Sequence, residues 1–319
     1  MKKYFTKEAF KNGFKILSGA FNGFLDDKGL KLSASLAYYT VFSLAPLLLL
    51  LISIAGAIYG KDAINDKIFG EINGLVGNQA AKQVQDMIKN VSLSGKTTSA
   101  VIIASVVLLL GATSIFVEIQ ESINMIWKVK AKPKRGWLKL LQDRLLSSSL
   151  IVALGFLLIV SLVVNGLVIA LSGILTRFLP DITVIFVQVI NIIISFLVIT
   201  ILFGVIFKVL PDVKIGWKDV RSGALFTAVL FMIGRFGIGL YISTTGAGST
   251  YGAAGSLIVI LVWVYYTAAI LYFGAEFTQS YAEFYGIKIA PASYAVHVQQ
   301  TEVERDVAVL PPQGNVEKK

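Results

Sequence analysis

The sequence predicts an all-α fold, a polytopic membrane helix bundle with six transmembrane helices. Of the 319 residues, 55% are hydrophobic and only 15% are charged. A soluble domain of this length carries about 25% charged residues. The apolar residues lie in long blocks, and the mean hydropathy is +0.74. Because no polar linker separates these blocks, we expect one membrane domain over residues 1–286.

Residues 5–25 are expected to form an N-terminal amphipathic helix. Its apolar side chains recur at steps of three and four, which places them on one stripe. The stripe consists of Phe10, Phe14, Leu17, Phe21 and Phe24. Lys7, Lys11 and Lys15 lie beside it. Lysines beside an apolar stripe suit a helix in the lipid headgroup region. A helix packed on the cytoplasmic ends of the bundle is an equally good interpretation.

Six hydrophobic segments follow, and each is long enough to cross a bilayer. We expect spans at about residues 34–59, 98–120, 146–172, 182–209, 220–243 and 253–280. Pro46 should kink the first span, since proline removes a backbone donor. Apolar residues at a rough helical spacing predict one or two short helices in the first outer loop, over 60–97. The polar residues 287–319 are expected to form a disordered cytoplasmic tail.

The net charge of +10 lies mostly between the hydrophobic segments. Basic residues there set membrane orientation and attract anionic headgroups. They concentrate before the first span and after the second and fourth, so both termini are expected to be cytoplasmic. The expected partners are therefore membrane lipids, including anionic headgroups at the cytoplasmic face, and not nucleic acid.

Neither a cofactor nor a metal site is predicted. The chain has no cysteine and one histidine, His297, so Cys-ligated zinc and a site of several histidines are excluded. No short apolar core precedes Lys31, so we expect no cleavable signal peptide and a first span that stays in the membrane.

Three charged residues lie within the predicted spans, where an ionisable group is costly and often functional. Glu118 and Glu276 fall near the cytoplasmic side at a rise of about 1.5 Å per helical residue. The other polar residues at this level are Tyr38, Tyr39, Glu121, Asn124 and Gln279. We expect them to line one polar vestibule open to the cytoplasm. Alternatively, Glu276 and Glu118 are interfacial carboxylates that reach water.

The third intramembrane charge, Arg235, is expected about 20 Å from the cytoplasmic side. Asn165, Gln188 and Asn191 share its depth. A guanidinium with amide neighbours could hold an anionic headgroup or substrate, because it presents a fork of donors that stays charged. Alternatively, Arg235 bonds helix-end carbonyls and locks the bundle.

The turn before the last span is rich in small residues and reads GAGSTYGAAGS over 246–256. It lacks the Gly-Lys-Ser/Thr ending of a phosphate-binding loop. We therefore interpret it as a tight turn that lets the fifth and sixth spans approach closely.

Three segments resemble the YihY/BrkB family of inner-membrane proteins. They are SLAYYTVFSLAPLLLLLISIAG at 35–56, GATSIFVEIQESINMIWKVK at 111–130 and YGAAGSLIVILVWVYYTAAILYFGAEFTQSYAEFYG at 251–286. The similarity covers about residues 10–285. It implies six spans in the inner (plasma) membrane and carries over no catalytic residue. The polar candidates at the motif positions are Tyr38, Tyr39, Glu118, Gln120, Asn124 and Glu276.

Some members of that family have been proposed to transport lipids or lipid-A-like molecules, and others are linked to serum resistance. The resemblance therefore implies a transporter or flippase-like protein for a lipid or another amphipathic anion, and not an enzyme. A non-transporting membrane scaffold, with the N-terminal helix and the tail recruiting partners, is the alternative. The family has also carried the label ribonuclease BN. A tRNA-processing ribonuclease is the least expected function, because the sequence offers no metal-ligand set.

Overall fold

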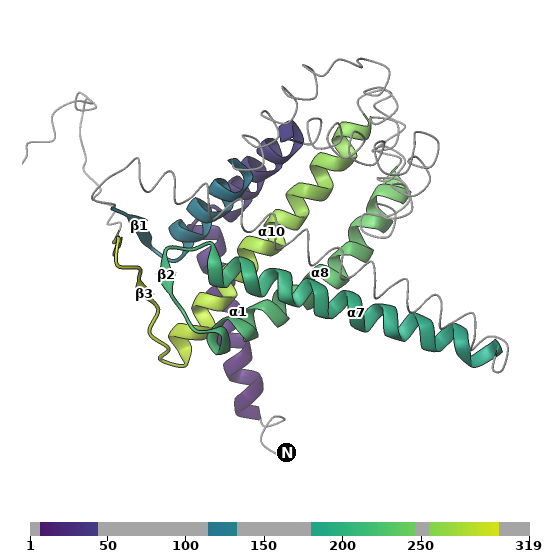
Figure 1. Cartoon of the computed structure of the whole chain (residues 1–319), viewed down its shortest axis with the longest axis horizontal. Coiled ribbons are helices and arrows are strands. Elements are labelled where there is room, and N and C mark those ends of the chain that lie inside the picture. Colours follow the sequence, from purple (N-terminus) through teal and green to yellow (C-terminus); the bar gives the residue numbers. More distant parts are fainter. Residues whose placement is uncertain (1–6, 44–113, 133–179, 246–254, 300–319) are drawn as a thin grey trace, which may run out of the picture.

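The computed structural model describes residues 7–43, 114–132, 180–245 and 255–299 (Figure 1). Its long helices are α1 (Lys7–Asp26), α7 (Pro180–Val209), α8 (Trp217–Thr245) and α10 (Gly255–Phe284). Residues 29–43 and 114–126 are also helical. The strands are β1 (Val129–Ala131), β2 (Val213–Lys214), β3 (Ala290–Pro291) and β4 (Ala295–His297).

Three of the described helices are long and apolar enough to cross a membrane. These segments are Val189–Val209 in α7, Trp217–Tyr241 in α8 and Leu257–Phe284 in α10. They correspond to the spans predicted at 182–209, 220–243 and 253–280.

The other three predicted spans are described in part or not at all. Of 34–59 and 98–120, only 34–43 and 114–120 are described, and both are helical. The span at 146–172, the proposed kink at Pro46 and the outer-loop helices of 60–97 lie outside the described residues.

Local sequence explains where α8 begins and where α10 ends. At the start of α8, the Asp219 carboxylate accepts a hydrogen bond from the Gly216 backbone N–H at 3.1 Å, which is half of a capping box. At the end of α10, Gly286 has φ +68°, a left-handed conformation that glycine adopts without strain. The N–H groups of Ile287 and Gly286 donate to the carbonyls of Ala282 and Glu283, which is the Schellman pattern.

Helices α8 and α10 pack antiparallel through reciprocal glycine–threonine contacts. A Cβ on Gly223 would meet Thr278 Oγ1 at 1.8 Å, and a Cβ on Gly274 would meet Thr227 Oγ1 at 2.0 Å. Both threonine hydroxyls donate to a carbonyl one turn earlier in their own helix. The close approach of the last two spans is therefore present. Glycines within the helices carry it here, and the turn to which we attributed it lies largely outside the described residues.

Helix α1 packs antiparallel on the C-terminal half of α10. Its buried face is formed by Ile16, Ala20 and Phe24, and the Phe24 ring meets Phe273 edge to face at 5.8 Å. Of the stripe predicted from the sequence, only Phe24 is buried, and the other four apolar residues are exposed. The structure thus places α1 against the bundle. A position of its exposed face in the headgroup region stays a prediction.

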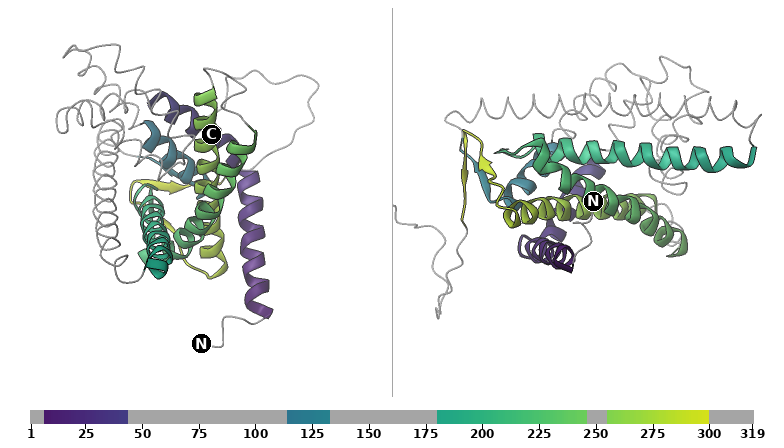
Figure 2. Two further views of the ribbon diagram at one scale, coloured as in Figure 1. Left: turned by 90° about the vertical axis from the view of Figure 1, so that its right-hand side faces the viewer. Right: turned by 90° about the horizontal axis from the view of Figure 1, so that it is seen from below.

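Two short antiparallel strand pairs correct the expectation of an entirely helical protein. β1 pairs with β4 so that Val129 faces His297, and β2 pairs with β3 so that Val213 faces Pro291. These strands gather at the end of the molecule opposite the start of α7 (Figure 2). The prediction that disorder begins at residue 287 is therefore wrong for 287–299, because backbone pairing with two earlier segments orders them. Residues 300–319 lie outside the described residues.

The core forms where the helices converge near these strands. It joins residues of α1, 29–43, 114–129, α7, α8 and α10, including Ile123, Trp127, Phe207 and Tyr272. By contrast, α7 and α8 each keep a row of exposed apolar side chains. Leu225, Val229, Ile233, Phe236 and Leu240 form the row on α8. Apolar rows on helices of this length suit contact with lipid.

Candidate functional site

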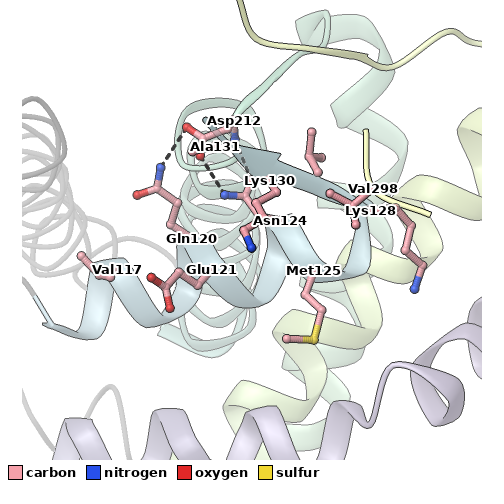
Figure 3. A pocket seen from close by; sticks show the side chains of 11 residues that line it. Val117, Gln120, Glu121, Asn124, Met125, Lys128, Lys130, Ala131, Asp212 and Val298 are labelled. Atoms are coloured by element: carbon pink, nitrogen blue, oxygen red, sulfur yellow. Dashed lines mark hydrogen bonds between the residues drawn. The ribbon is translucent and has the colours of Figure 1, made fainter. Parts of the chain in front are cut away.

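The first candidate site is a buried polar cluster around Asp212, which lies just beyond the end of α7 and is 2% exposed. Its carboxylate accepts hydrogen bonds from Asn124 Nδ2 at 2.9 Å, Gln120 Nε2 at 3.2 Å and the Tyr294 hydroxyl at 2.9 Å. The Asp212 backbone N–H donates to Asn124 Oδ1 at 2.8 Å. Gln120 and Asn124 are four residues apart, so one face of the 114–126 helix supplies both amides (Figure 3).

This cluster ties three distant segments together. Asp212 belongs to the connection between α7 and α8, its amide partners belong to the 114–126 helix, and Tyr294 precedes β4. The Asp212 carbonyl also accepts a hydrogen bond from the Ala292 N–H at 2.9 Å. A buried carboxylate is tolerated when several donors satisfy it, so the cluster fixes these segments relative to one another.

A cavity of about 520 Å³ opens beside the cluster. One side is polar, with Gln120, Asn124, Asp212 and Glu121, whereas Val117, Met125, Val129 and Val298 supply apolar surface. Lys128 and Lys130 also line it. The Lys128 ammonium group points away from the other lining side chains (Figure 3). The cavity therefore combines charged, amide and apolar surface at the end of the bundle where the strands lie.

A second polar cluster lies between α1 and α10. Glu276 is 4% exposed, and its carboxyl group lies within hydrogen-bonding range of the carboxyl group of Asp27. Lys128 forms an ion pair with Asp27. A Cβ on Gly23 would meet Glu276 Oε2 at 2.5 Å, so glycine at this position gives the carboxylate room against the α1 backbone.

The turns that hold this cluster have a common geometry. Lys28 and Lys128 both adopt φ 55°, and each ends a helix by donating its N–H to the carbonyl three residues earlier. These turns place Asp27 and Lys128 beside the C-terminal half of α10. Trp127 Nε1 donates to the Ala275 carbonyl at 3.1 Å, which fixes the end of the 114–126 helix next to Glu276.

The residues predicted to share one vestibule do not line one common cavity among the described residues. Asn124 lines the cavity described above, whereas Glu276 faces Asp27. Glu118 is half-buried near Tyr272. Gln279 donates to Glu283 at 3.1 Å and lines a second cavity, of about 150 Å³, together with residues of the strand pairs.

The two tyrosines predicted for the vestibule lie on the surface of the described structure. Tyr38 is 58% exposed and Tyr39 is 41% exposed. Their rings are 5.8 Å apart, and the Tyr38 ring is 4.7 Å from that of Phe42. Neither tyrosine lines the two described cavities. The neighbouring hydroxyls of Ser33, Thr40 and Ser43 donate to carbonyls of their own helix.

The deeper group of candidates is described only in part. Arg235 is exposed on α8, and Asn191 is half-buried on α7. Gln188 lies within α7, but the position of its side chain is not described. Asn165 lies outside the described residues. Arg235 borders the exposed apolar row of α8, so a headgroup-binding role for it stays a prediction.

Four residues of the two clusters were not predicted as site residues. They are Asp27, Lys128, Asp212 and Tyr294. Each lies in a connection or beyond the last span, where a charged or polar residue is ordinary. A signal was present for Asp212, because the acid follows a long apolar helix directly in the sequence Leu-Pro-Asp, and an acid at a helix C-terminus opposes the helix dipole.

The long apolar helices with buried polar clusters between them define a polytopic helical membrane protein. Residues 20–295 match the family model of Virulence factor BrkB. The chain belongs to this BrkB/YihY family, as its motifs indicated.

The chain is also similar to proteins named UPF0761 membrane proteins. The chain is 30% identical over 268 residues to a UPF0761 membrane protein of Stenotrophomonas maltophilia, covering 82% of this chain and 59% of the relative. It is 30% identical over 270 residues to a UPF0761 membrane protein of Xanthomonas oryzae, covering 82% of this chain and 59% of the relative. It is 28% identical over 251 residues to one of Verminephrobacter eiseniae, covering 77% of this chain and 57% of the relative. The chain thus spans about three-fifths of the length of these relatives. No solved structure matches it.

Proposed function

We propose that this membrane protein is a transporter or flippase-like protein for a lipid or another amphipathic anion. The observation that supports it most is the cavity of about 520 Å³ lined by Asp212, a residue that lies between the two membrane-length helices α7 and α8 in the chain. Lys130 in its lining suits an anionic headgroup, and its apolar wall, with Met125 and Val129, suits the start of an acyl chain. A lipid needs both surfaces at once.

The proposed orientation places this cavity at the cytoplasmic face of the inner membrane. Support comes from charge, because the exposed Lys130 and Lys132 lie at this end of the bundle and Lys214 lies in β2. Basic residues accumulate in cytoplasmic connections. Anionic headgroups would meet the cavity there, and Arg235 would lie deeper along the path.

Lipid translocation by the purified protein in liposomes tests the proposal. Arg235→Ala and Glu276→Gln are each expected to lower the rate of fluorescent anionic lipid translocation at least about tenfold, which corresponds to about 1.4 kcal/mol. The physical reason is that each removes a charge from a membrane-spanning helix, where charges are kept at a cost. The initial rate at equal amounts of folded protein is the quantity to compare.

Matched controls come from the same two helices. Arg221→Ala removes an exposed arginine near the start of α8, and Glu283→Gln removes an exposed carboxylate near the end of α10. Both should translocate lipid at the wild-type rate. Unchanged rates in both Arg235→Ala and Glu276→Gln would remove the case for these residues, and no translocation by the wild type would remove the proposed function.

A scaffold role is the second candidate, and the exposed face of α1 favours it. Phe10 and Phe14 are 82% and 67% exposed, on a helix whose opposite face is packed on α10. A scaffold would lose its function when Phe10 and Phe14 are replaced by serine, and would keep it in Arg235→Ala. The transporter predicts the reverse.

A further inference from the structure

The Asp27–Glu276 cluster holds an unbalanced charge. Glu276 is almost fully buried, and the Asp27 side chain is 11% exposed. Lys128 pairs with Asp27 and is the one cation that the described contacts bring to the two acids. With both acids ionised, the three groups together carry one negative charge. A net charge in a buried site of this kind is strongly unfavourable.

Hydrogen bonding leads to the same conclusion independently. A carboxylate can only accept hydrogen bonds, whereas a protonated carboxyl group also donates one. The Glu276 Oε1 atom is buried and meets no donor among the described residues. The neighbouring Asp27 carboxyl group lies within hydrogen-bonding range. Two acceptors therefore face one another, and one proton between them would supply the missing donor.

We propose that Asp27 and Glu276 form a proton-binding site that holds one exchangeable proton, with Lys128 balancing the remaining charge. The proton lies between the two carboxyl groups and leaves toward solvent along the Lys128 side, which is 37% exposed. A metal cation fits less well. Hard cations need about six oxygen ligands, and the described residues place no third acid or histidine at this pair.

Among the described residues, the remaining neighbours of Glu276 bring no second cation. On α10 itself, Glu283 lies two turns further on, is exposed and accepts a hydrogen bond from Gln279. Helix α8 presents the uncharged Gly223 and Thr227 to this part of α10. Helix α1 contributes Gly23, which has no side chain, and Trp127 bonds to the Ala275 carbonyl.

The proton site and the cavity beside Asp212 share a residue. Lys128 lines that cavity and also pairs with Asp27, so it borders both sites. An anion that drew the ammonium group toward the cavity would leave two carboxylates facing each other and would favour uptake of a proton. Proton coupling of this kind rests on the transporter proposed above. The proton site itself does not.

Infrared difference spectroscopy of the purified full-length protein tests the site without any lipid being moved. The wild type is expected to show the carbonyl-stretch band of a protonated carboxylic acid at low pH and to lose it as the pH rises. Glu276→Gln leaves Asp27 paired with Lys128. Asp27→Asn removes that partner, so that Lys128 is left to balance the charge of Glu276, and the band should be absent from both variants. Glu283→Gln should keep it.

The outcomes separate cleanly. No band in the wild type, or a band that survives in either Glu276→Gln or Asp27→Asn, overturns the shared proton. A band that disappears when sodium replaces choline in the buffer also overturns it, because a metal cation would then occupy the site. If the protein does not translocate lipid, the infrared band still tests the proton site. If the band is missing, the translocation assay still tests the proposed function.

Discussion

Gly223→Ala is expected to destabilise the protein by about 1–3 kcal/mol, the usual range for overpacking a well-packed contact. The new methyl group would lie 1.8 Å from Thr278 Oγ1, 2.8 Å from its Cβ and 3.2 Å from its Cγ2. Rotating the threonine cannot relieve all three contacts, so α8 and α10 must separate. The midpoint of thermal unfolding in detergent, measured on equal amounts of monodisperse protein, reports the change.

A second glycine of the same helix provides the control. A Cβ on Gly237 would meet no atom of the described residues within 4 Å. Gly237→Ala should therefore keep the wild-type stability or raise it by up to about 1 kcal/mol through helix propensity. The penalty of Gly223→Ala should also shrink in a Thr278→Gly background, which makes the interaction measurable as a double-mutant cycle. Equal unfolding midpoints for the two single alanine variants would refute the close contact.

Asp212→Ala is expected to cost roughly 3 kcal/mol or more, because it leaves several buried donors without their acceptor. Each unsatisfied buried donor costs about 1–3 kcal/mol, and Gln120, Asn124 and Tyr294 all donate to this carboxylate. The unfolding midpoint should fall, and residues 290–297 should become accessible to protease, since the Tyr294 anchor is lost.

Two milder variants bracket this effect. Tyr294→Phe removes one of the three side-chain donors and should cost about 1 kcal/mol. Asp26→Ala removes an exposed aspartate and should stay within about 0.5 kcal/mol of wild type. An Asp212→Ala protein as stable as Asp26→Ala would show that the cluster does not hold the three segments together.

The membrane-spanning helices were the most predictable part of the fold. Length and apolarity alone located α7, α8 and α10, because a bilayer imposes a minimum apolar length on any spanning helix. The close approach of α8 and α10 was expected from the small residues of the 246–256 turn, whereas glycines within the two helices carry it. Which glycines face which threonines was not predictable, since that depends on the rotation of one helix against the other.

The strands and clusters could not be predicted for a related reason. Strands of two or three residues, such as β3 and β4, are too short to show an alternating pattern, and their partners lie far away in the sequence. Asp27 and Asp212 lie in connections, where an acid normally faces water. Here Lys128 meets the half-buried Asp27, and the amides of the 114–126 helix meet the buried Asp212 in the folded chain.

The N-terminal helix illustrates the limit of amphipathic patterns. The predicted stripe of five apolar residues packs on α10 only through Phe24, and Ile16 and Ala20 form the rest of the buried face. Gly23 allows this close approach, since a Cβ there would lie 2.5 Å from Glu276 Oε2. The room that Gly23 leaves for Glu276, which the apolar pattern does not show, is part of what selects the buried face.

The strand pairs also impose an order on biogenesis. β1 and β2 emerge from the ribosome before α10 has been made, whereas their partners β4 and β3 follow α10. Since a nascent chain emerges N-terminus first, neither pair can form until the last span has been synthesised. The connections that carry β1 and β2 stay without these partners throughout membrane insertion. Closure of this end of the bundle is thus a late assembly step, and a chain truncated before residue 290 would insert its helices but never complete it.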